Sequence, residues 1–150
     1  MKIVDELEVV SVEDDGSEAC PQAIIAKKSD ASCQVRLHGD HIVKQLLLDN
    51  GWYLVFLLDG NVYEETLRVF LLDQNLKTLD GIEFGAAYVS GTFEEFKIHN
   101  KFSVSFKFVH VETCVIELNE SAQIEAPLLK KGVRRIGWNI RRYLKPRWQT

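Results

Sequence analysis

The residues best suited to chemistry in this chain are four histidines, three cysteines and several pairs of carboxylates. His38 and His41 lie three residues apart with Asp40 between them, a spacing with which a metal site or an acid–base site can begin. The surrounding HGDH stretch is also typical of a polar loop that leads into the next element, and we favour that interpretation. Because His99 is expected in a turn and His110 in a strand, the histidines predict no catalytic centre.

The cysteines Cys20, Cys33 and Cys114 are odd in number and include no CxxC pair. A structural zinc site needs four ligands, commonly in paired spacing, so these residues predict no metal site. We expect three reduced thiols, with Cys114 buried in a strand. A Cys20–Cys33 disulfide is the alternative, and a reducing cytosol disfavours it. Neither a metal nor a cofactor is predicted.

Pairs of adjacent carboxylates occur at Asp14-Asp15, Glu64-Glu65 and Glu94-Glu95. Neighbouring residues in a strand point to opposite faces, so these pairs do not converge on one substrate. They are typical of a solvated acidic surface or of an acidic protein-binding face. We therefore expect a protein without enzymatic activity.

The elements that carry these residues are predicted to be mainly strands, because apolar and polar residues alternate along most of the chain. LEVVSVE forms one strand, and AIIAKK and CQVRLH form a hairpin around the turn SDAS. WYLVFLL, residues 52–58, is apolar on both faces and is expected to be a central strand. Five or six strands joined by short turns between Trp52 and Leu118 predict an antiparallel meander.

Two segments instead show helical spacing. Ile42, Val43, Leu46 and Leu47 fit one face of a short helix, with Asp40 as its N-cap. Residues 127–146 predict a basic amphipathic helix, which Gly132 and Gly137 weaken by about 1 kcal/mol each.

The predicted fold class is therefore α+β, mainly β: a twisted antiparallel meander with one short helix and a C-terminal basic helix. At 150 residues the chain fits a single domain. We expect residues 1–126 to form a β-rich body and residues 127–146 a helix packed on it. The expected core residues include Phe56, Leu67, Val69, Phe102, Val104, Phe106 and Cys114.

Charge is distributed unevenly along the chain. Residues 126–150 contain eight Lys and Arg and no Asp or Glu, whereas the other 125 residues contain 10 basic and 22 acidic residues. The acidic body would repel phosphate, which disfavours a nucleic-acid or membrane role for the basic segment. We expect its arginines to neutralise the acidic surface beside it.

The N-terminal sequence lacks the apolar run of a signal peptide, and WYLVFLL is far shorter than the ~20 residues of a membrane span. We therefore expect a cytoplasmic protein.

The middle third of the chain, from Asp49 to Gly91, has a distinctive succession of strands and polar residues. The residues that carry this pattern are Trp52, Leu54, Phe56, Tyr63-Glu64-Glu65, Leu67, Leu71-Leu72-Asp73, Leu79-Asp80, Tyr88 and Gly91. This stretch resembles small bacterial immunity proteins of contact-dependent growth inhibition and related polymorphic toxin systems. The resemblance implies a cytoplasmic inhibitor that binds one cognate toxin domain and blocks its active site.

Many toxins of this type are nucleases with basic clefts, which an acidic surface would complement. The candidate toxin-binding residues, expected to be exposed on the sheet and its turns, are Asp59, Glu64, Glu65, Asp73 and Asp80. Two alternatives stay open: a nucleic-acid- or membrane-associated module that uses the basic segment, and an enzyme with a pocket lined by His38, His41 and carboxylates.

Overall fold

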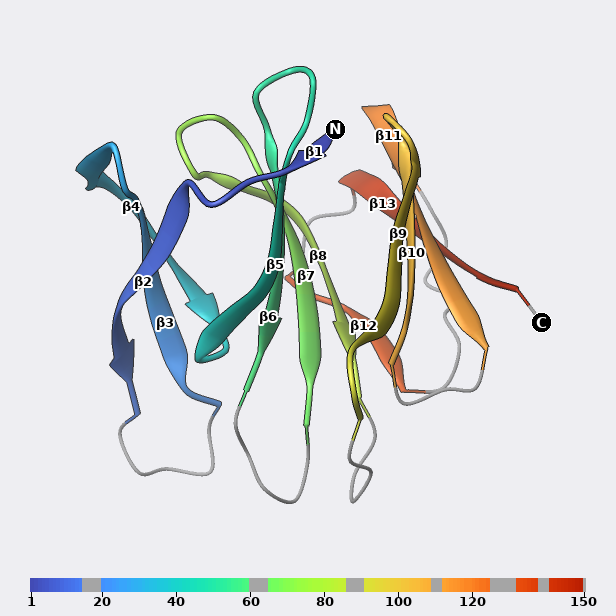
Figure 1. Cartoon of the computed structure of the whole chain (residues 1–150), viewed down its shortest axis with the longest axis horizontal. Helices are drawn as coiled ribbons and strands as arrows, with labels where there is room; N and C mark the ends of the chain where they lie inside the picture. The colour runs from blue at the N-terminus through green and yellow to red at the C-terminus, as the bar shows by residue number, and fades with distance from the viewer. Residues whose placement is uncertain are drawn as a thin grey trace.

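The computed structural model describes residues 1–14, 20–59, 65–85, 91–108, 112–124, 132–137 and 141–149, and Figure 1 shows their arrangement. Every helix or strand in these ranges is a β-strand, and the strands pair antiparallel in three sheets. The expected α+β class is therefore wrong, and the described chain is all-β. In this part of the chain, no helix has the length and apolar character needed to cross a membrane.

A six-stranded sheet forms the middle layer. Its strand order is β1-β5-β6-β7-β8-β12, so β6, β7 and β8 form the first part of the antiparallel meander predicted between Trp52 and Leu118, whereas β5 lies in a segment predicted to be helical. β6 and β7 pair along their whole length, from Tyr53 opposite Leu72 to Leu58 opposite Leu67. The strands are β1 (Lys2–Ile3), β5 (His41–Leu47), β6 (Tyr53–Leu58), β7 (Leu67–Leu72), β8 (Thr78–Phe84) and β12 (Val133–Arg135).

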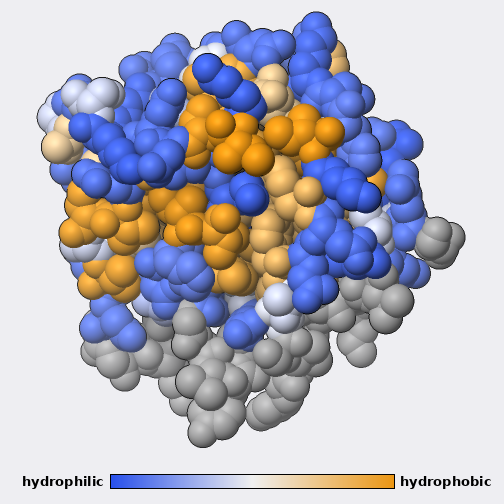
Figure 2. Space-filling view, in the orientation of Figure 1, coloured by the Kyte–Doolittle hydropathy of each residue, from blue (hydrophilic) through white to orange (hydrophobic). Residues whose placement is uncertain are grey.

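Two smaller sheets cover the two faces of the central sheet, as Figure 1 shows, one built from the start of the chain and one from its second half. In the same orientation, Figure 2 shows hydrophobic residues in the middle of the molecule with hydrophilic residues around them. The three-stranded sheet has the order β2-β3-β4 and contains the predicted β3–β4 hairpin; its strands are β2 (Leu7–Glu13), β3 (Gln22–Lys27) and β4 (Asp30–His38). The four-stranded sheet has the order β13-β11-β10-β9; its strands are β9 (Glu94–Asn100), β10 (Ser103–Lys107), β11 (Thr113–Ile124) and β13 (Arg141–Gln149).

The central sheet has one hydrophobic core on each face. Along β6, Tyr53, Val55 and Leu57 pack toward the three-stranded sheet, whereas Leu54 and Phe56 pack toward the four-stranded sheet. A strand covered on both faces has no solvent side, which explains why β6 is apolar at every position. Each of these side chains contributes roughly 1.5–3 kcal/mol when it is fully buried.

Most of the predicted core is confirmed. Phe102 is the exception: it lies in the turn between β9 and β10 and is 36% exposed. The predicted residues that are buried are Phe56, Leu67, Val69, Val104, Phe106 and Cys114.

The predicted short helix at residues 42–47 is wrong, because this segment is strand β5. Ile42 and Leu47 pack into the core beneath the three-stranded sheet, while Val43 and Leu46 pack into the opposite core. A register shift between Ile42 and Lys44 allows two consecutive residues to face the same side. A strand buried on both faces and interrupted by a bulge therefore has the spacing of apolar residues that a helix would have.

The predicted C-terminal helix is also wrong in its described parts, residues 132–137 and 141–149. Val133–Arg135 is β12, paired with β8, and Arg141–Gln149 is β13, paired with β11. Gly132 and Gly137 have φ angles of 85° and 79°, which glycine adopts without strain and which end a regular run. Pro146 is accommodated because β13 is the edge strand of its sheet. Residues 125–131 and 138–140 of this segment lie outside the described residues.

The side chain of Gln45 joins the central sheet to the three-stranded sheet. Its Oε1 accepts hydrogen bonds from the backbone N–H groups of Glu6 (3.0 Å) and Leu7 (2.9 Å), and its Nε2 donates to the carbonyl of Leu7 (3.0 Å). Gln45 is buried, and its amide provides hydrogen-bond partners for the buried N–H and carbonyl of Leu7 and for the part-buried N–H of Glu6. This residue therefore fixes the point at which the chain passes from β1 to β2.

Candidate functional site

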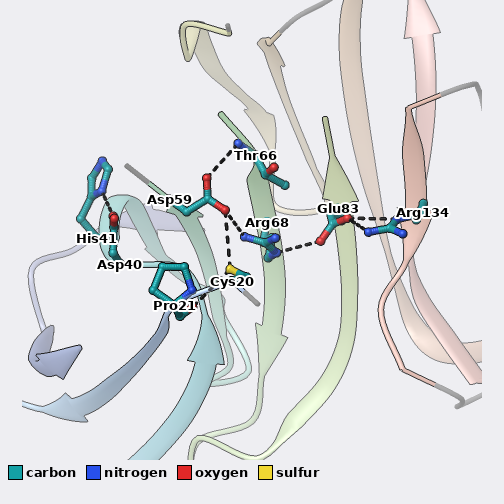
Figure 3. Close-up of polar contacts among 9 residues, drawn as sticks. All are labelled: Cys20, Pro21, Asp40, His41, Asp59, Thr66, Arg68, Glu83 and Arg134. Atoms are coloured by element: carbon teal, nitrogen blue, oxygen red, sulfur yellow. Dashed lines mark hydrogen bonds and ion pairs between the residues drawn. The ribbon is translucent and has the colours of Figure 1, made fainter. Parts of the chain in front are cut away.

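A group of ionisable side chains forms a chain of ion pairs at one end of the central sheet (Figure 3). Arg68, on β7, donates from Nη1 to Oδ2 of Asp59 at 2.9 Å and from Nε to Oε2 of Glu83 at 2.8 Å. Glu83, on β8, also accepts a hydrogen bond from Nε of Arg134 on β12 at 3.0 Å. The Sγ atom of Cys20 lies 3.5 Å from Oδ2 of Asp59. We call these five residues the arginine cluster.

The arginine cluster is stabilised in one protonation state. Burial would raise the pKa of Glu83, but the hydrogen bond from Arg134 and the charge of Arg68 outweigh it and hold that pKa below its ordinary value. Burial would lower the pKa of Arg68, but the hydrogen bond to Asp59 and the charge of Glu83 raise it overall. Burial raises the pKa of the Cys20 thiol to about 11. At neutral pH Cys20 is therefore protonated and a poor nucleophile, and Glu83 is ionised and a poor general acid.

A polar pocket of about 370 Å³ lies beside the arginine cluster and includes His38 in its lining. His41, in contrast, points away from Arg68 (Figure 3), and its Nδ1 contacts the carboxylate of Asp40. The structure therefore does not bring the two histidines of the HGDH stretch into one site. Within the described ranges, no three His, Cys, Asp or Glu side chains converge as metal ligands.

A histidine–serine contact occurs on the four-stranded sheet, where Nε2 of His99 lies 2.7 Å from Oγ of Ser105. His99 lies on β9 and not in the turn expected from sequence, and Ser105 is buried on β10. A nucleophilic serine needs a base and, in most such sites, a third group that orients the base. Neither residue lines the arginine-cluster pocket, so we assign the pair a structural role.

A second buried charge, Asp80, ties the central sheet to β13. Its Oδ2 accepts hydrogen bonds from the backbone N–H groups of Tyr143 (2.9 Å) and Leu144 (2.8 Å), and its Oδ1 accepts one from Arg142 (3.2 Å). The Nη1 atom of Arg135 lies 3.6 Å from Oδ2. Oδ1 of Asp80 also accepts a hydrogen bond from the backbone N–H of Gly81 (2.8 Å). Two arginines and three backbone donors thus converge on one carboxylate, which is an arrangement that stabilises sheet packing.

The five candidate toxin-binding residues do not form one surface. Asp59 is 6% exposed and Asp80 is 3% exposed, so neither has the exposure expected of it. Glu65 and Asp73 are half-buried and lie at opposite ends of β7, and Asp73 also accepts hydrogen bonds from two backbone N–H groups of its own turn. Glu64 lies outside the described residues.

Four described arginines of the basic C-terminal segment contact acidic residues of the body, as the charge distribution predicted. Arg134 pairs with Glu83, Arg135 and Arg142 pair with Asp80, and Arg147 pairs with Glu117, whose Oε2 lies 3.1 Å from its Nε. These contacts are made from strands and not from the helix that was expected.

An apolar hollow lies at the other end of the central sheet, between the β5–β6 turn and the β9–β10 turn. Its apolar lobe has a volume of about 100 Å³ and includes Leu48, Trp52, Leu71, Phe102 and Leu118 in its lining. A wider polar lobe of about 550 Å³ shares Phe102, Leu118, Asn119 and Glu120 with it. We call the two lobes together the end groove, and its form is that of a binding surface because it combines an apolar hollow with a polar border.

Two signals in the sequence point to these sites. Arg68 interrupts the apolar run LRVFLL, and a charge in a strand that is otherwise buried requires a buried counter-charge such as Asp59. Phe102 follows Asn100 and Lys101 in a turn, where an aromatic residue has less cover than in mid-strand. Sequence reasoning assigned Phe102 to the core and Asp59 to the surface, and the structure reverses both assignments.

No protein-family model, curated protein or solved structure matches the chain.

Proposed function

We propose that the protein is a cytoplasmic immunity protein that binds a cognate toxin domain and blocks the active site of that toxin. The observation that carries the proposal is the end groove, because it places an exposed aromatic residue, Phe102, beside an apolar hollow and a border of amides and carboxylates. Protein interfaces commonly centre on an apolar anchor site that is surrounded by polar groups.

The state of the ionisable groups supports binding over catalysis. The carboxylates of Asp59, Asp80 and Glu83 are held by arginines inside the fold, and the Cys20 thiol is protonated at neutral pH. These groups therefore stabilise the structure, and the groove that remains is suited to contact. The resemblance of residues 49–91 to immunity proteins supports the same class of function.

The surface near the end groove suits a basic toxin. Glu120 lines both lobes and Glu117 lines the polar lobe. Asp73 begins the neighbouring β7–β8 turn, in which Gln74 lies against Gly51 of the β5–β6 turn. Carboxylates on this side would attract a cationic cleft and accelerate the encounter. The basic C-terminal segment does not favour the alternative role in nucleic-acid or membrane binding, because four of its described arginines contact acidic side chains.

Co-expression tests this proposal. The product of the gene immediately upstream of this one would be expressed in bacteria with and without the chain, and growth would be followed. We expect the upstream product to arrest growth and the wild-type chain to restore it. Phe102→Ser should lose protection, whereas Val10→Asp, at a 47% exposed position on β2, should retain it.

The proposal fails if the upstream product is not toxic, or if the chain neither binds it nor protects against it. Circular dichroism of both variants would show that they fold, so that lost protection reports lost binding.

A further inference from the structure

The apolar lobe of the end groove is the size of one side chain. Its volume of about 100 Å³ is smaller than the cavity of about 150 Å³ that holds a benzene molecule in a protein core. It is far smaller than the ~300–1,000 Å³ of sites that enclose a cofactor or drug-sized ligand. Trp52, Phe102 and Leu118 in its lining suit an aliphatic group, so the lobe fits a single anchor side chain of a partner protein.

The polar lobe next to it favours a cation. The described residues that line it include no Lys or Arg. They do include Glu117 and Glu120, together with the amides of Asn100, Asn119 and Gln123. Arg147 neutralises Glu117 from the side of β13, and Glu120 is exposed. The lobe therefore combines hydrogen-bond acceptors with net negative charge, as a Lys or Arg side chain requires.

Lys101 determines where in the end groove a cationic group can bind. It lines the apolar lobe, and its Nζ lies 4.7 Å from the centroid of the Phe102 ring. Asp49 also lines this lobe, but its carboxylate is paired with the N-terminal ammonium group. A second cation beside Lys101 would therefore be repelled, whereas one over Glu120 would be attracted. The cationic group of a partner is thus directed away from the lysine and into the polar lobe.

The backbone of β11 along this groove is suited to an extended segment. β10 pairs with β11 only as far as Glu117, and the pairing with β13 shifts register between Leu118 and Gln123. The described strand ladders therefore leave residues 119–122 without a partner strand. Asn119, Glu120 and Ser121 of this stretch line the polar lobe, where a bound peptide would meet their backbone groups.

From these features we infer that the end groove binds an extended segment of the toxin in which an aliphatic side chain is followed closely by Lys or Arg. The aliphatic group occupies the apolar lobe, and the cation lies over Glu120 in the polar lobe. This inference rests on the proposed function, because it takes the end groove as the contact surface for a protein.

Peptide titration of the full-length chain, labelled with ¹⁵N, tests the inference without the toxin. The probe is acetyl-Gly-Gly-Leu-Arg-Gly-Gly-amide, with Leu-Glu and Ala-Arg versions as matched controls. We expect the Leu-Arg peptide to shift the Trp52 indole and the Asn119 and Ser121 amide signals, with an affinity at least about tenfold above either control. Glu120→Gln should reduce the preference for Leu-Arg over Leu-Glu, and Phe102→Ser should weaken both.

The inference is overturned if no peptide binds, if the Arg and Glu peptides bind equally, or if the shifts map away from the end groove. Signals of the groove that change with protein concentration in the absence of peptide would indicate that a second copy of the chain occupies it, and would overturn the inference too. Peptide binding without toxicity of the upstream product would refute the proposed function alone. Protection of cells without peptide binding would refute this inference alone.

Discussion

Replacing Asp80 with Ala should greatly lower the free energy of unfolding of this protein, because Asp80 joins the central sheet to β13. The change removes the acceptor of the Gly81, Tyr143 and Leu144 N–H groups. It also removes the counter-charge of Arg142 and Arg135. Both arginine side chains are about nine-tenths buried, so water does not replace the carboxylate.

The magnitude follows from the loss of one partner of a buried ion pair, which costs about 3–5 kcal/mol. The two arginines keep one other acceptor each, since Arg135 donates to the carbonyl of Leu144 and Arg142 to that of Ile136. We therefore take this range without adding the cost of the three N–H groups to it. With about 2–4 °C of melting temperature per kcal/mol for a chain of this size, the midpoint should fall by about 6–20 °C.

Urea unfolding followed by tryptophan fluorescence measures this cost, with Asp73→Ala as the control. Asp73 accepts two N–H groups in an exposed turn, so its loss should cost only about 1 kcal/mol. Asp80→Asn, which keeps the shape and one acceptor oxygen, should lie between the two. If the free energy of unfolding of Asp80→Ala lies within about 0.5 kcal/mol of the wild-type value, Asp80 does not join the central sheet to β13. A role for Asp80 in binding the toxin would then be reopened.

Three further perturbations test the packing. Gln45→Leu should lower the free energy of unfolding by about 2–4 kcal/mol in chemical denaturation, because it leaves the N–H groups of Glu6 and Leu7 and the carbonyl of Leu7 without the hydrogen bonds of Gln45. As a control, Gln34→Leu at an exposed position should cost little. Burial raises the pKa of the Cys114 thiol from 9.0 to about 12, so the unfolded chain loses this proton at a lower pH than the folded chain does. The free energy of unfolding should therefore fall above pH 9, by about 1.4 kcal/mol per pH unit, until about pH 12. A Cys114→Val variant should show a shallower decline, and an equally steep one would contradict the assignment. Gly81→Ala would place a Cβ 3.1 Å from both Ile136 Cβ and Phe70 Cδ1, and should reduce the melting temperature through an overpacking cost of about 1–3 kcal/mol.

The strands could be predicted because alternation is a local property. The central position of β6 followed from its apolar residues on both faces, and the meander followed from short turns between strands. The division into three sheets could not be predicted, because it depends on which faces meet and not on any one segment. β5 shows the consequence: its burial between two sheets gives Ile42, Val43, Leu46 and Leu47 a helix-like spacing.

The charged residues were harder to place because their partners are distant in sequence. Arg142 and Asp80 are 62 residues apart, and Arg134 and Glu83 are 51 apart. Composition showed that a basic segment balances an acidic body, but not that the balance occurs inside the fold. The sequence therefore predicts Asp59 and Asp80 on the surface, whereas the neighbouring strands bury both side chains.

The most direct test of the proposed function is isothermal titration calorimetry of the chain against the product of the upstream gene. We expect a one-to-one complex with a dissociation constant on the order of nanomolar, weakened at least about tenfold by Phe102→Ser and unchanged by Val10→Asp. Absence of binding by the wild-type chain, or equal affinity of the wild type and Phe102→Ser, would contradict it.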